Sequence, residues 1–276
     1  MNMSGIIKDA VKYPSSDWKK ILIFGIIILI TTIPATINRH SLISTNDVTL
    51  IWFLGIISFL SFFFIRGYSI RIIKSSLTDS PELPKFNNWI GMFIDGIKLF
   101  IIPIVYLVPA ILIILIYSAL YSLSNPSTVI NILSGVGIYY FIGGTGLTAL
   151  FSWLGIWSYI IIIYAIIILP IILMAITHMV NNNSKLLTAF QFKDIIDKIS
   201  LLGWRNLIIG YILTVIVSLS LIAIFLFFIA FLFLLMQGFG IALTQTLIVE
   251  DVLIPLFLLP YLLMYFFRSV ALFYKS

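Results

Sequence analysis

Long apolar runs separated by shorter polar stretches make up most of the chain. Six of these runs predict membrane-spanning helices, over about residues 21–37, 48–65, 97–122, 153–177, 207–235 and 252–267. Several exceed the roughly 18 apolar residues that mark a spanning helix. They are too long for barrel strands, and a helix satisfies its own backbone hydrogen bonds in lipid. The pattern predicts an all-α, polytopic (multi-pass) integral membrane protein with about six transmembrane helices in a single membrane domain, residues 1–276.

Two polar stretches beside these runs have apolar residues at helical spacing. In residues 4–13 one face carries Ile6, Ile7, Ala10 and Val11. In residues 184–203 the apolar positions are Leu187, Phe190, Ile195, Ile199 and Leu202. Spacings of three and four residues predict amphipathic helices that lie in the membrane interface.

The six runs form three hairpins with similar beginnings. Each hairpin follows a polar stretch, and each begins with a tryptophan and a glycine six or seven residues later: Trp18/Gly25, Trp89/Gly96 and Trp204/Gly210. This recurrence predicts three pseudo-repeats, over about residues 1–80, 81–184 and 185–276. The alternative is that an interfacial tryptophan and a tolerated glycine accompany spans in general.

The charged residues are few and lie beside the apolar runs. Hydrophobic residues make up 62% of the chain and charged residues 9%, whereas a soluble domain is about one quarter charged. Of the sixteen Lys and Arg residues, fifteen lie at the N-terminus, in 66–98, in 185–205 or at the C-terminus, and only Arg39 lies in the opposite loops. Because cations concentrate in cytoplasmic loops, this positive-inside asymmetry predicts a plasma-membrane protein with both termini in the cytoplasm. The same placement argues against nucleic acid as the partner of a chain with net charge +6.

Residues 123–150 do not fit the simple hairpin pattern. If 128–149 spanned the membrane, residues 185–205 and their four cations would move to the outer side. We therefore expect an outer loop with a re-entrant or interfacial helix, and a full span is the remaining alternative. The glycines of this region do not indicate a nucleotide site, because such a loop needs a preceding strand and a soluble βαβ unit.

Three cations near the end of the second run are candidate contacts for an anionic lipid or a partner. Arg66, Arg71 and Lys74 are five and three residues apart, so they lie roughly on one side of a continuing helix. Such a group can bind anionic headgroups or a partner's acidic patch. The alternative is that they only anchor the span in its orientation.

The connection that follows is a candidate docking loop. Its residues are Pro81, Pro84, Phe86, Trp89 and Asp95. The prolines stiffen the chain and the aromatic rings can enter the interface, so the loop is expected to set how the first two hairpins pack, or to meet a partner. Asp95 lies near a helix N-terminus and three residues before Lys98, which favours capping and ion pairing.

The sequence does not indicate catalysis, a metal or a cofactor. The chain has no cysteine, and no ionisable side chain falls in the middle of a predicted span, where coupled carriers usually keep one. His40 and His178 fall on opposite membrane faces, although the outer carboxylates Asp47, Glu250 and Asp251 could meet near His40 or cap the last span. An enzyme acting on lipid headgroups would need the cytoplasmic acids to converge: Asp79, Glu82, Asp95, Asp194 and Asp197.

Three segments resemble a known family. AVKYPSSDWKKILIFG, FIRGYSIRIIKSSL and PELPKFNNWIGMFIDGIKLFIIPIVYLVP are similar to the membrane-protein family described as domain of unknown function 4013, which is found largely in archaea. The close similarity covers about the first 110 residues, and the remainder agrees mainly in hydropathy. The resemblance implies a multi-span integral membrane protein and brings no activity or catalytic residues with it.

These patterns favour a non-enzymatic accessory or interaction protein. Its basic cytoplasmic face is expected to bind membrane lipids of anionic type or another membrane protein. The alternative is a permease for an apolar or lipid-like small molecule, which would need a cavity lined by Gln237, Thr244 or Gln245.

Overall fold

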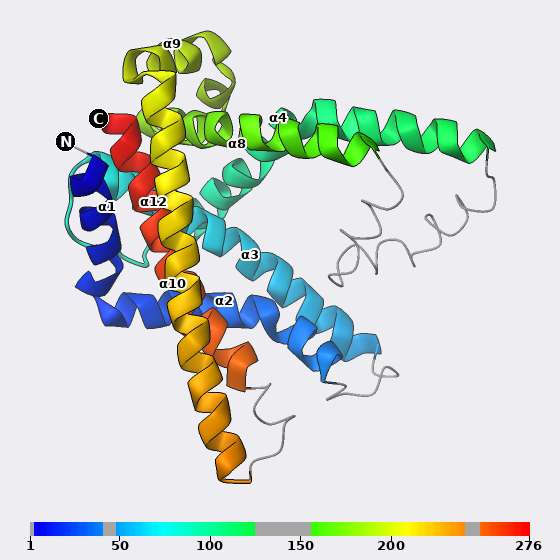
Figure 1. Ribbon diagram of the computed structural model, residues 1–276, viewed down its shortest axis with the longest axis vertical. Coiled ribbons are helices and arrows are strands. Elements are labelled where there is room, and N and C mark those ends of the chain that lie inside the picture. The colour runs from blue at the N-terminus through cyan, green and yellow to red at the C-terminus, as the bar shows by residue number, and fades with distance from the viewer. Residues whose placement is uncertain (1–2, 41–47, 125–155, 241–248) are drawn as a thin grey trace. The chain divides into compact units, whose positions relative to one another are not determined.

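A computed structural model describes residues 3–40, 48–124, 156–240 and 249–276 (Figure 1). Over these ranges the chain forms helices joined by turns, with no strand. Because apolar runs of this length satisfy their backbone hydrogen bonds as helices, the structure confirms the all-α class. The predicted outer loop at 123–150 falls mostly outside the described residues, as do Asp47, Thr244 and Gln245.

Five stretches are long and apolar enough to cross a membrane: Trp18–Ile37, Trp52–Leu77, Trp89–Ile116, Trp204–Gly238 and Val249–Lys275. They lie in α2 (Trp18–Arg39), α3 (Val48–Leu77), α4 (Trp89–Ser124), α10 (Trp204–Gly238), and the π-helical turn η3 (Ile254–Leu258) with α12 (Leu259–Lys275). The fourth predicted run lies in α8 (Ile156–Asn181), where Ile166–Asn181 is a shorter apolar helix. The chain is therefore a polytopic helical membrane protein.

Shorter helices precede two of the long ones. α1 (Met3–Lys12) and the 3-10 turn η1 (Pro14–Ser16) come before α2, and η2 (Leu186–Phe190) and α9 (Phe192–Leu202) come before α10. Trp18, Trp89 and Trp204 are the first residues of α2, α4 and α10. Each predicted hairpin thus starts with a long helix whose first residue is the tryptophan. The threefold repeat itself stays a prediction.

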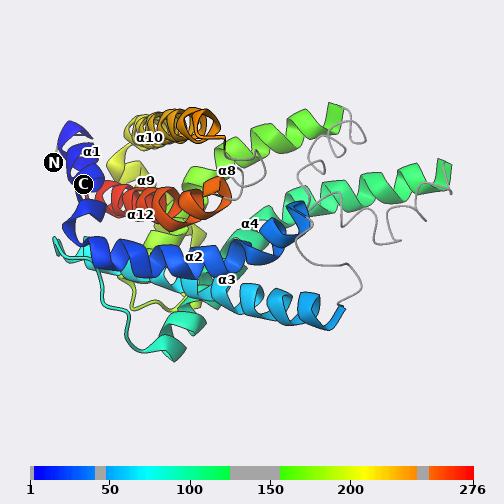
Figure 2. The ribbon, with the colours of Figure 1, turned by 90° about the horizontal axis from the view of Figure 1, so that it is seen from below.

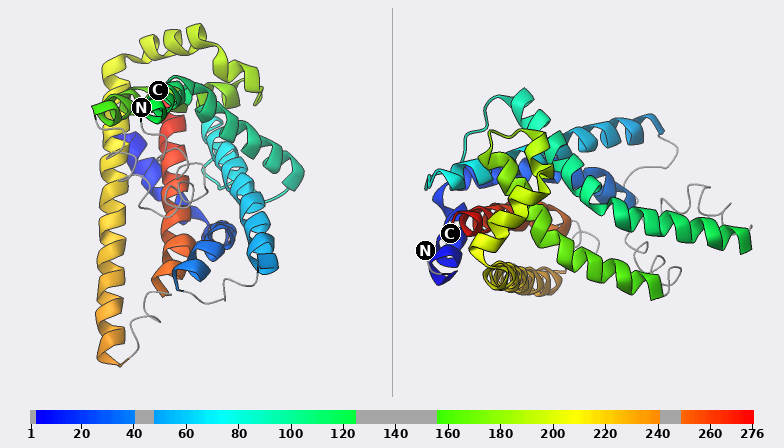
Figure 3. Two further views of the ribbon diagram at one scale, coloured as in Figure 1. Left: turned by 90° about the vertical axis from the view of Figure 1, so that its right-hand side faces the viewer. Right: turned by 90° about the horizontal axis from the view of Figure 1, so that it is seen from above.

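The chain forms two compact units, residues 1–101 with 173–276, and residues 102–172. In the first unit α2 and α3 lie side by side (Figure 2), and α12 packs against α1, α2, α3 and α10 (Figures 1 and 3). A buried cluster joins α2, α3, α12 and the start of α4 through Tyr13, Ile21, Phe24, Ile28, Tyr68, Ile72, Leu83, Met92 and Met264. In the second unit the Tyr164 hydroxyl donates to the Tyr106 carbonyl at 2.6 Å.

Glycines allow the helix backbones of the first unit to approach closely. A Cβ at Gly25 in α2 would lie 2.1 Å from the Leu256 carbonyl oxygen in η3. Between α3 and α4 the contact is reciprocal: a Cβ at Gly67 would lie 1.7 Å from the Met92 oxygen, and one at Gly96 would lie 1.9 Å from the Phe63 oxygen. Small residues serve this purpose widely in membrane helix pairs.

Candidate functional site

The connection between α3 and α4, residues 78–88, is held by side chains from other helices. The Arg268 guanidinium donates to the Ser80 carbonyl at 2.9 Å, and the Tyr13 hydroxyl donates to the Glu82 carbonyl at 3.3 Å. The Lys20 ammonium donates to the Leu83 carbonyl at 2.7 Å. An irregular backbone has no internal ladder to satisfy its carbonyls, so these donors fix the connection against α1, α2 and α12.

Side chains of α3 hold the second half of the same connection. The Tyr68 hydroxyl donates to the Pro84 carbonyl at 3.1 Å. The Arg71 guanidinium donates to the carbonyls of Lys85 at 3.0 Å and Asn88 at 2.8 Å. The fork of Arg71 thus bridges two points of the connection, as a guanidinium with five N–H donors can.

The aromatic residues of the predicted docking loop lie against α3. The Phe86 ring stacks on Tyr68 with a centroid distance of 4.1 Å, and Trp89 meets Phe64 edge-on at 5.6 Å. Pro84 is half-buried, whereas Pro81 is exposed. The contacts of Phe86 and Trp89 attach the start of α4 to α3. A role of this loop in meeting a partner stays a prediction.

The three predicted cations do not all lie at one site. The Arg66 guanidinium lies 4.3 Å from the Phe62 ring centroid, and its Nη1 donates to the Leu99 carbonyl of α4 at 3.4 Å. Five helical residues turn the direction of a side chain by about 140°, so Arg66 points to α4 while Arg71 points to the connection. The structure brings Arg71 and Lys74 into one hollow, and Arg66 does not line it.

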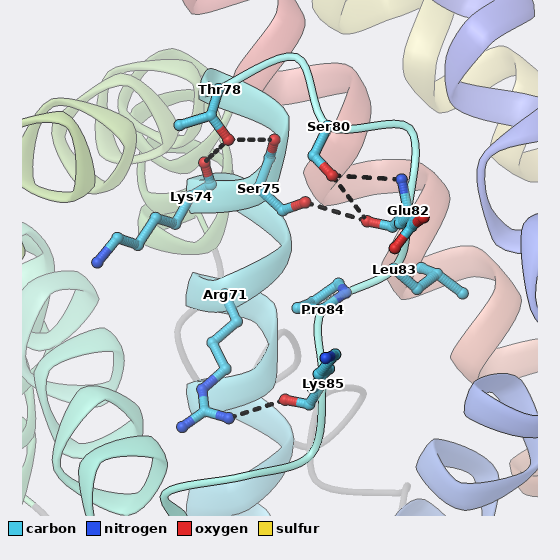
Figure 4. A pocket seen from close by; sticks show the side chains of 9 residues that line it. All are labelled: Arg71, Lys74, Ser75, Thr78, Ser80, Glu82, Leu83, Pro84 and Lys85. Atoms are coloured by element: carbon cyan, nitrogen blue, oxygen red, sulfur yellow. Dashed lines mark hydrogen bonds between the residues drawn. The ribbon is translucent and has the colours of Figure 1, made fainter.

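This hollow is open, with a volume of about 370 Å³, and lies between the end of α3 and residues 80–85 (Figure 4). Its lining consists of Arg71, Lys74, Ser75, Thr78, Ser80, Glu82, Leu83, Pro84 and Lys85. We name it the α3 hollow. It contains three cations and one carboxylate, so its formal charge is 3 − 1 = +2.

Two ammonium groups of the α3 hollow are available to a ligand. Arg71 is already bound to the connection, and the hydroxyls of Ser75 and Thr78 donate to the carbonyls of Glu82 at 3.1 Å and Ser75 at 3.0 Å. Within the described part of the chain, the ammonium groups of Lys74 and Lys85 have no hydrogen bond or ion pair. The arrangement can bind an anion, because each ammonium offers three donors.

A buried ion pair that the sequence analysis did not anticipate joins the two ends of the chain. The Arg268 side chain is 4% exposed, and its Nε and Nη2 atoms each lie 2.9 Å from Oδ2 of Asp9. Its guanidinium also lies 4.5 Å from the Tyr13 ring centroid, and burial raises the pKa of the Tyr13 hydroxyl. A second ion pair joins Lys275 to Asp79. The only signal in the sequence was the cluster of basic and aromatic residues at the C-terminus.

Asp95 and Asp251 lie in pairs that are separate from the connection. Asp95 accepts from Lys98 at 2.8 Å, the pair that their spacing favours. Asp251 pairs with Arg39 at 2.5 Å and with His40 at 2.9 Å, so one of the predicted outer acids does meet His40. His178 bonds to the Tyr274 hydroxyl at 2.9 Å. Over the described ranges no three His, Asp or Glu side chains could hold a metal ion.

The predicted apolar stripe of residues 184–203 divides between two helices. Ile195 and Ile199 in α9 are buried, but Leu187 is 80% exposed. Leu187 belongs to the separate 3-10 helix η2, which ends at Phe190, so it does not continue the helical register of α9. The single helical register expected over 184–203 is therefore interrupted between η2 and α9, and the interfacial position of the stripe stays a prediction.

Comparison with known proteins gives one family. The model of a family described as protein of unknown function (DUF4013) matches residues 50–235, more than half of the chain and including the α3 hollow. The match extends well beyond the first 110 residues but leaves out residues 1–49, which contain the Tyr-Pro…Asp-Trp segment. No curated protein and no solved structure matches the chain.

Proposed function

Given that this chain belongs to the DUF4013 family of proteins of unknown function, we propose its function from its own residues. It is a non-enzymatic, multi-pass protein of the plasma membrane whose basic cytoplasmic end binds anionic lipid. The observation that carries the proposal is the α3 hollow with its two unpaired ammonium groups, Lys74 and Lys85. The neighbouring Arg71 adds a third positive charge.

The position of the α3 hollow along α3 favours a lipid headgroup. The membrane-length stretch Trp52–Leu77 ends within one helical turn of Lys74 and Thr78. A ligand in the hollow would therefore lie at the depth of the headgroups. Each Lys or Arg near an anionic membrane surface contributes about 1 kcal/mol of attraction.

The neighbouring elements support a cytoplasmic position. The ion pairs of Arg268 with Asp9 and of Lys275 with Asp79 bring α1, α12 and the connection together. α1 also carries Lys8 and Lys12, and the first turn of α2 carries Lys20, whose ammonium donates to the Leu83 carbonyl of the connection. Cations gather on the cytoplasmic side of a membrane protein, so we assign this end and both termini to the cytoplasm.

Calorimetric titration of the purified protein in neutral detergent tests the proposal. The ligand is short-chain phosphatidylglycerol, with phosphatidylcholine as the neutral control. The variant K74A/K85A removes both free ammonium groups. We expect it to weaken phosphatidylglycerol binding by roughly 30-fold, which corresponds to about 1 kcal/mol for each lysine.

A matched variant separates the α3 hollow from general charge. K8A/K12A removes the same charge from exposed positions of α1 and should weaken binding only slightly. Equal losses in both variants would contradict a localised site. Equal binding of the two lipids by the unchanged protein would contradict the anionic-lipid function and leave a protein partner as its replacement.

A further inference from the structure

Two prolines inside the long helices remove a donor from their own backbone. Pro34 lies within α2, and Pro103 lies within α4. In an α-helix each amide donates to the carbonyl four residues back, and proline has no N–H. The carbonyls of Ile30 and Leu99 therefore lack their usual hydrogen bond. Lipid cannot supply one, so a carbonyl freed within a spanning helix needs a donor from a neighbouring helix or from water.

The helix α3 supplies a donor to each of these carbonyls. The Ser58 hydroxyl donates to the Ile30 carbonyl at 3.3 Å, and Nη1 of Arg66 donates to the Leu99 carbonyl at 3.4 Å. Figure 2 shows α2 and α3 side by side, and the reciprocal glycine contact brings α4 close to α3. One helix thus donates to the freed carbonyls of two different neighbours.

Ser58 differs from other hydroxyl residues of the long helices. The hydroxyls of Ser69, Thr177 and Thr214 each donate to the carbonyl four residues back in their own helix, at 3.0, 2.8 and 2.9 Å. This local bond is a common one for Ser and Thr inside a helix. Ser58 donates to another helix, and its acceptor is the carbonyl that Pro34 frees. The difference indicates that the freed carbonyl competes successfully with the local acceptor.

Arg66 has few partners for a charged residue at its position. It lies within the membrane-length stretch Trp52–Leu77, where a charged side chain is costly and is normally paired. Within the described part of the chain it forms no ion pair. Its guanidinium lies 4.3 Å from the ring centroid of Phe62 and 5.6 Å from that of Phe100, and aromatic faces attract cations. The hydrogen bond to the Leu99 carbonyl adds an acceptor to these rings.

We propose that Ser58 and Arg66 fix the bends of α2 and α4 by replacing the amides that Pro34 and Pro103 lack. We call the two residues the bridging donors. A proline inside a helix kinks it, and a donor on a neighbouring helix holds the freed carbonyl in one direction and so selects one bend. This conformational role explains an arginine that does not line the α3 hollow, and it does not depend on lipid binding there.

A double-mutant cycle tests the role of Arg66. Arg66→Met keeps an apolar chain of similar length without the donors, and it should raise the unfolding equilibrium constant by about tenfold in a denaturing-detergent titration. Pro103→Ala restores the amide that donates to the Leu99 carbonyl, so in that background Arg66→Met should cost less than about threefold. Pro109→Ala is the matched control, because it restores a different amide of α4 and should leave the tenfold effect unchanged.

The other bridging donor gives a second, independent cycle. Ser58→Ala should raise the unfolding equilibrium constant by about threefold, a typical value for an interhelical hydrogen bond in a membrane, and this effect should vanish in the Pro34→Ala background. These mild variants keep the proposal testable even where Arg66→Met does not fold. Effects of Ser58→Ala and Arg66→Met that are the same with and without the corresponding proline would overturn the proposal.

Spin labels measure the bend itself, because the native chain contains no cysteine to remove. Ile90→Cys and Ile116→Cys place labels on exposed positions of α4 on either side of Pro103. Double electron–electron resonance should give a narrow distance distribution in the unchanged protein, a broad one in Arg66→Met, and a narrow one in Arg66→Lys, which keeps a donor. An unchanged distribution in Arg66→Met would overturn the proposal and leave Arg66 as a packing residue.

Discussion

α1 and α9 are both short helices that precede a long apolar helix beginning with tryptophan, yet the protein uses them differently. α1 is clamped: Asp9 pairs with Arg268, and the Tyr261 hydroxyl donates to the Val11 carbonyl at 2.6 Å. α9 buries Ile195 and Ile199, whereas Phe192 is 53% exposed and Ile196 is 47% exposed. Similar local patterns therefore acquire different roles from partners far away in the chain. α1 joins the packed core of the first unit, and the apolar side of α9 is only partly buried.

The largest effect is expected from breaking the clamp of α1. Asp9→Ala leaves Arg268 buried without its carboxylate. Removing one partner of a buried ion pair usually costs about 3–5 kcal/mol, and because Asp9 itself is partly exposed we expect about 3 kcal/mol of lost stability. Unfolding in a denaturing-detergent titration measures the loss. Lys8→Ala, an exposed control on the same helix, should change stability by less than about 0.5 kcal/mol, and equal effects of the two variants would disprove the clamp.

The next largest effect on stability is expected when the glycines of α2 and α10, the long helices that follow α1 and α9, are replaced by alanine. Gly25→Ala in α2 would place a Cβ 2.1 Å from a backbone oxygen, which cannot move without shifting η3. Overpacking of this kind costs about 2 kcal/mol. In Gly210→Ala of α10 the atoms nearest to the new Cβ belong to the Phe273 ring, at 2.7 Å, and the gain in helix propensity of about 1 kcal/mol offsets the displacement of that ring. The same unfolding titration should show Gly25→Ala to be clearly the more damaging, and the reverse order would contradict the packing described.

The starts of α2 and α10 differ in capping as well. Asp17 Oδ1 accepts from the backbone amides of Lys19 at 3.1 Å and Lys20 at 3.3 Å, whereas α10 follows Gly203 and has no side-chain cap. Asp17→Ala should cost about 1 kcal/mol at neutral pH. Unfolding titrations at several pH values measure this cost.

The contribution of Asp17 should depend on pH. Desolvation raises the pKa of the Asp17 carboxyl, but hydrogen bonds from Lys20 and its positive charge outweigh this and lower the pKa below its usual value of 3.8. A lowered folded-state pKa means that the contribution is complete above the unfolded-state pKa and is lost as the pH falls through the folded-state pKa. The cost of Asp17→Ala should therefore disappear in strong acid. A cost that does not change with pH would show that the carboxylate is not the cap.

The smallest effect on stability is expected on the half-exposed side of α9. Ile196→Ala shortens a side chain that is 47% exposed, so the stability of the protein in detergent should change by less than about 0.5 kcal/mol. Thermal unfolding in detergent checks this value. A loss of several kcal/mol would mean that Ile196 packs against protein, and α9 would then resemble α1.

The sequence predicted what depends on local pattern. Apolar length predicted the long helices, and the i,i+3 spacing of Asp95 and Lys98 predicted their pair. The interpretation of Arg66, Arg71 and Lys74 assumed a helix that continues past the apolar run, and α3 does continue to Leu77, because charged residues end an apolar run without ending a helix.

Contacts between distant residues could not be predicted in this way. Arg268 reaches Asp9 across 259 positions and Ser80 across 188, and no local periodicity encodes such pairs. The α3 hollow was predicted only in part, since Lys85 joins Arg71 and Lys74 through the path of the connection. Arg66 does not line the α3 hollow, because its guanidinium points to α4 and donates to the Leu99 carbonyl there.

Native mass spectrometry of the protein, extracted gently from its own membrane, shows directly whether the α3 hollow holds anionic lipid. Anionic phospholipid should stay bound to the unchanged chain and to K8A/K12A, and should be lost from K74A/K85A. Retention of a protein partner in place of anionic lipid, or of neutral lipid alone, would contradict it.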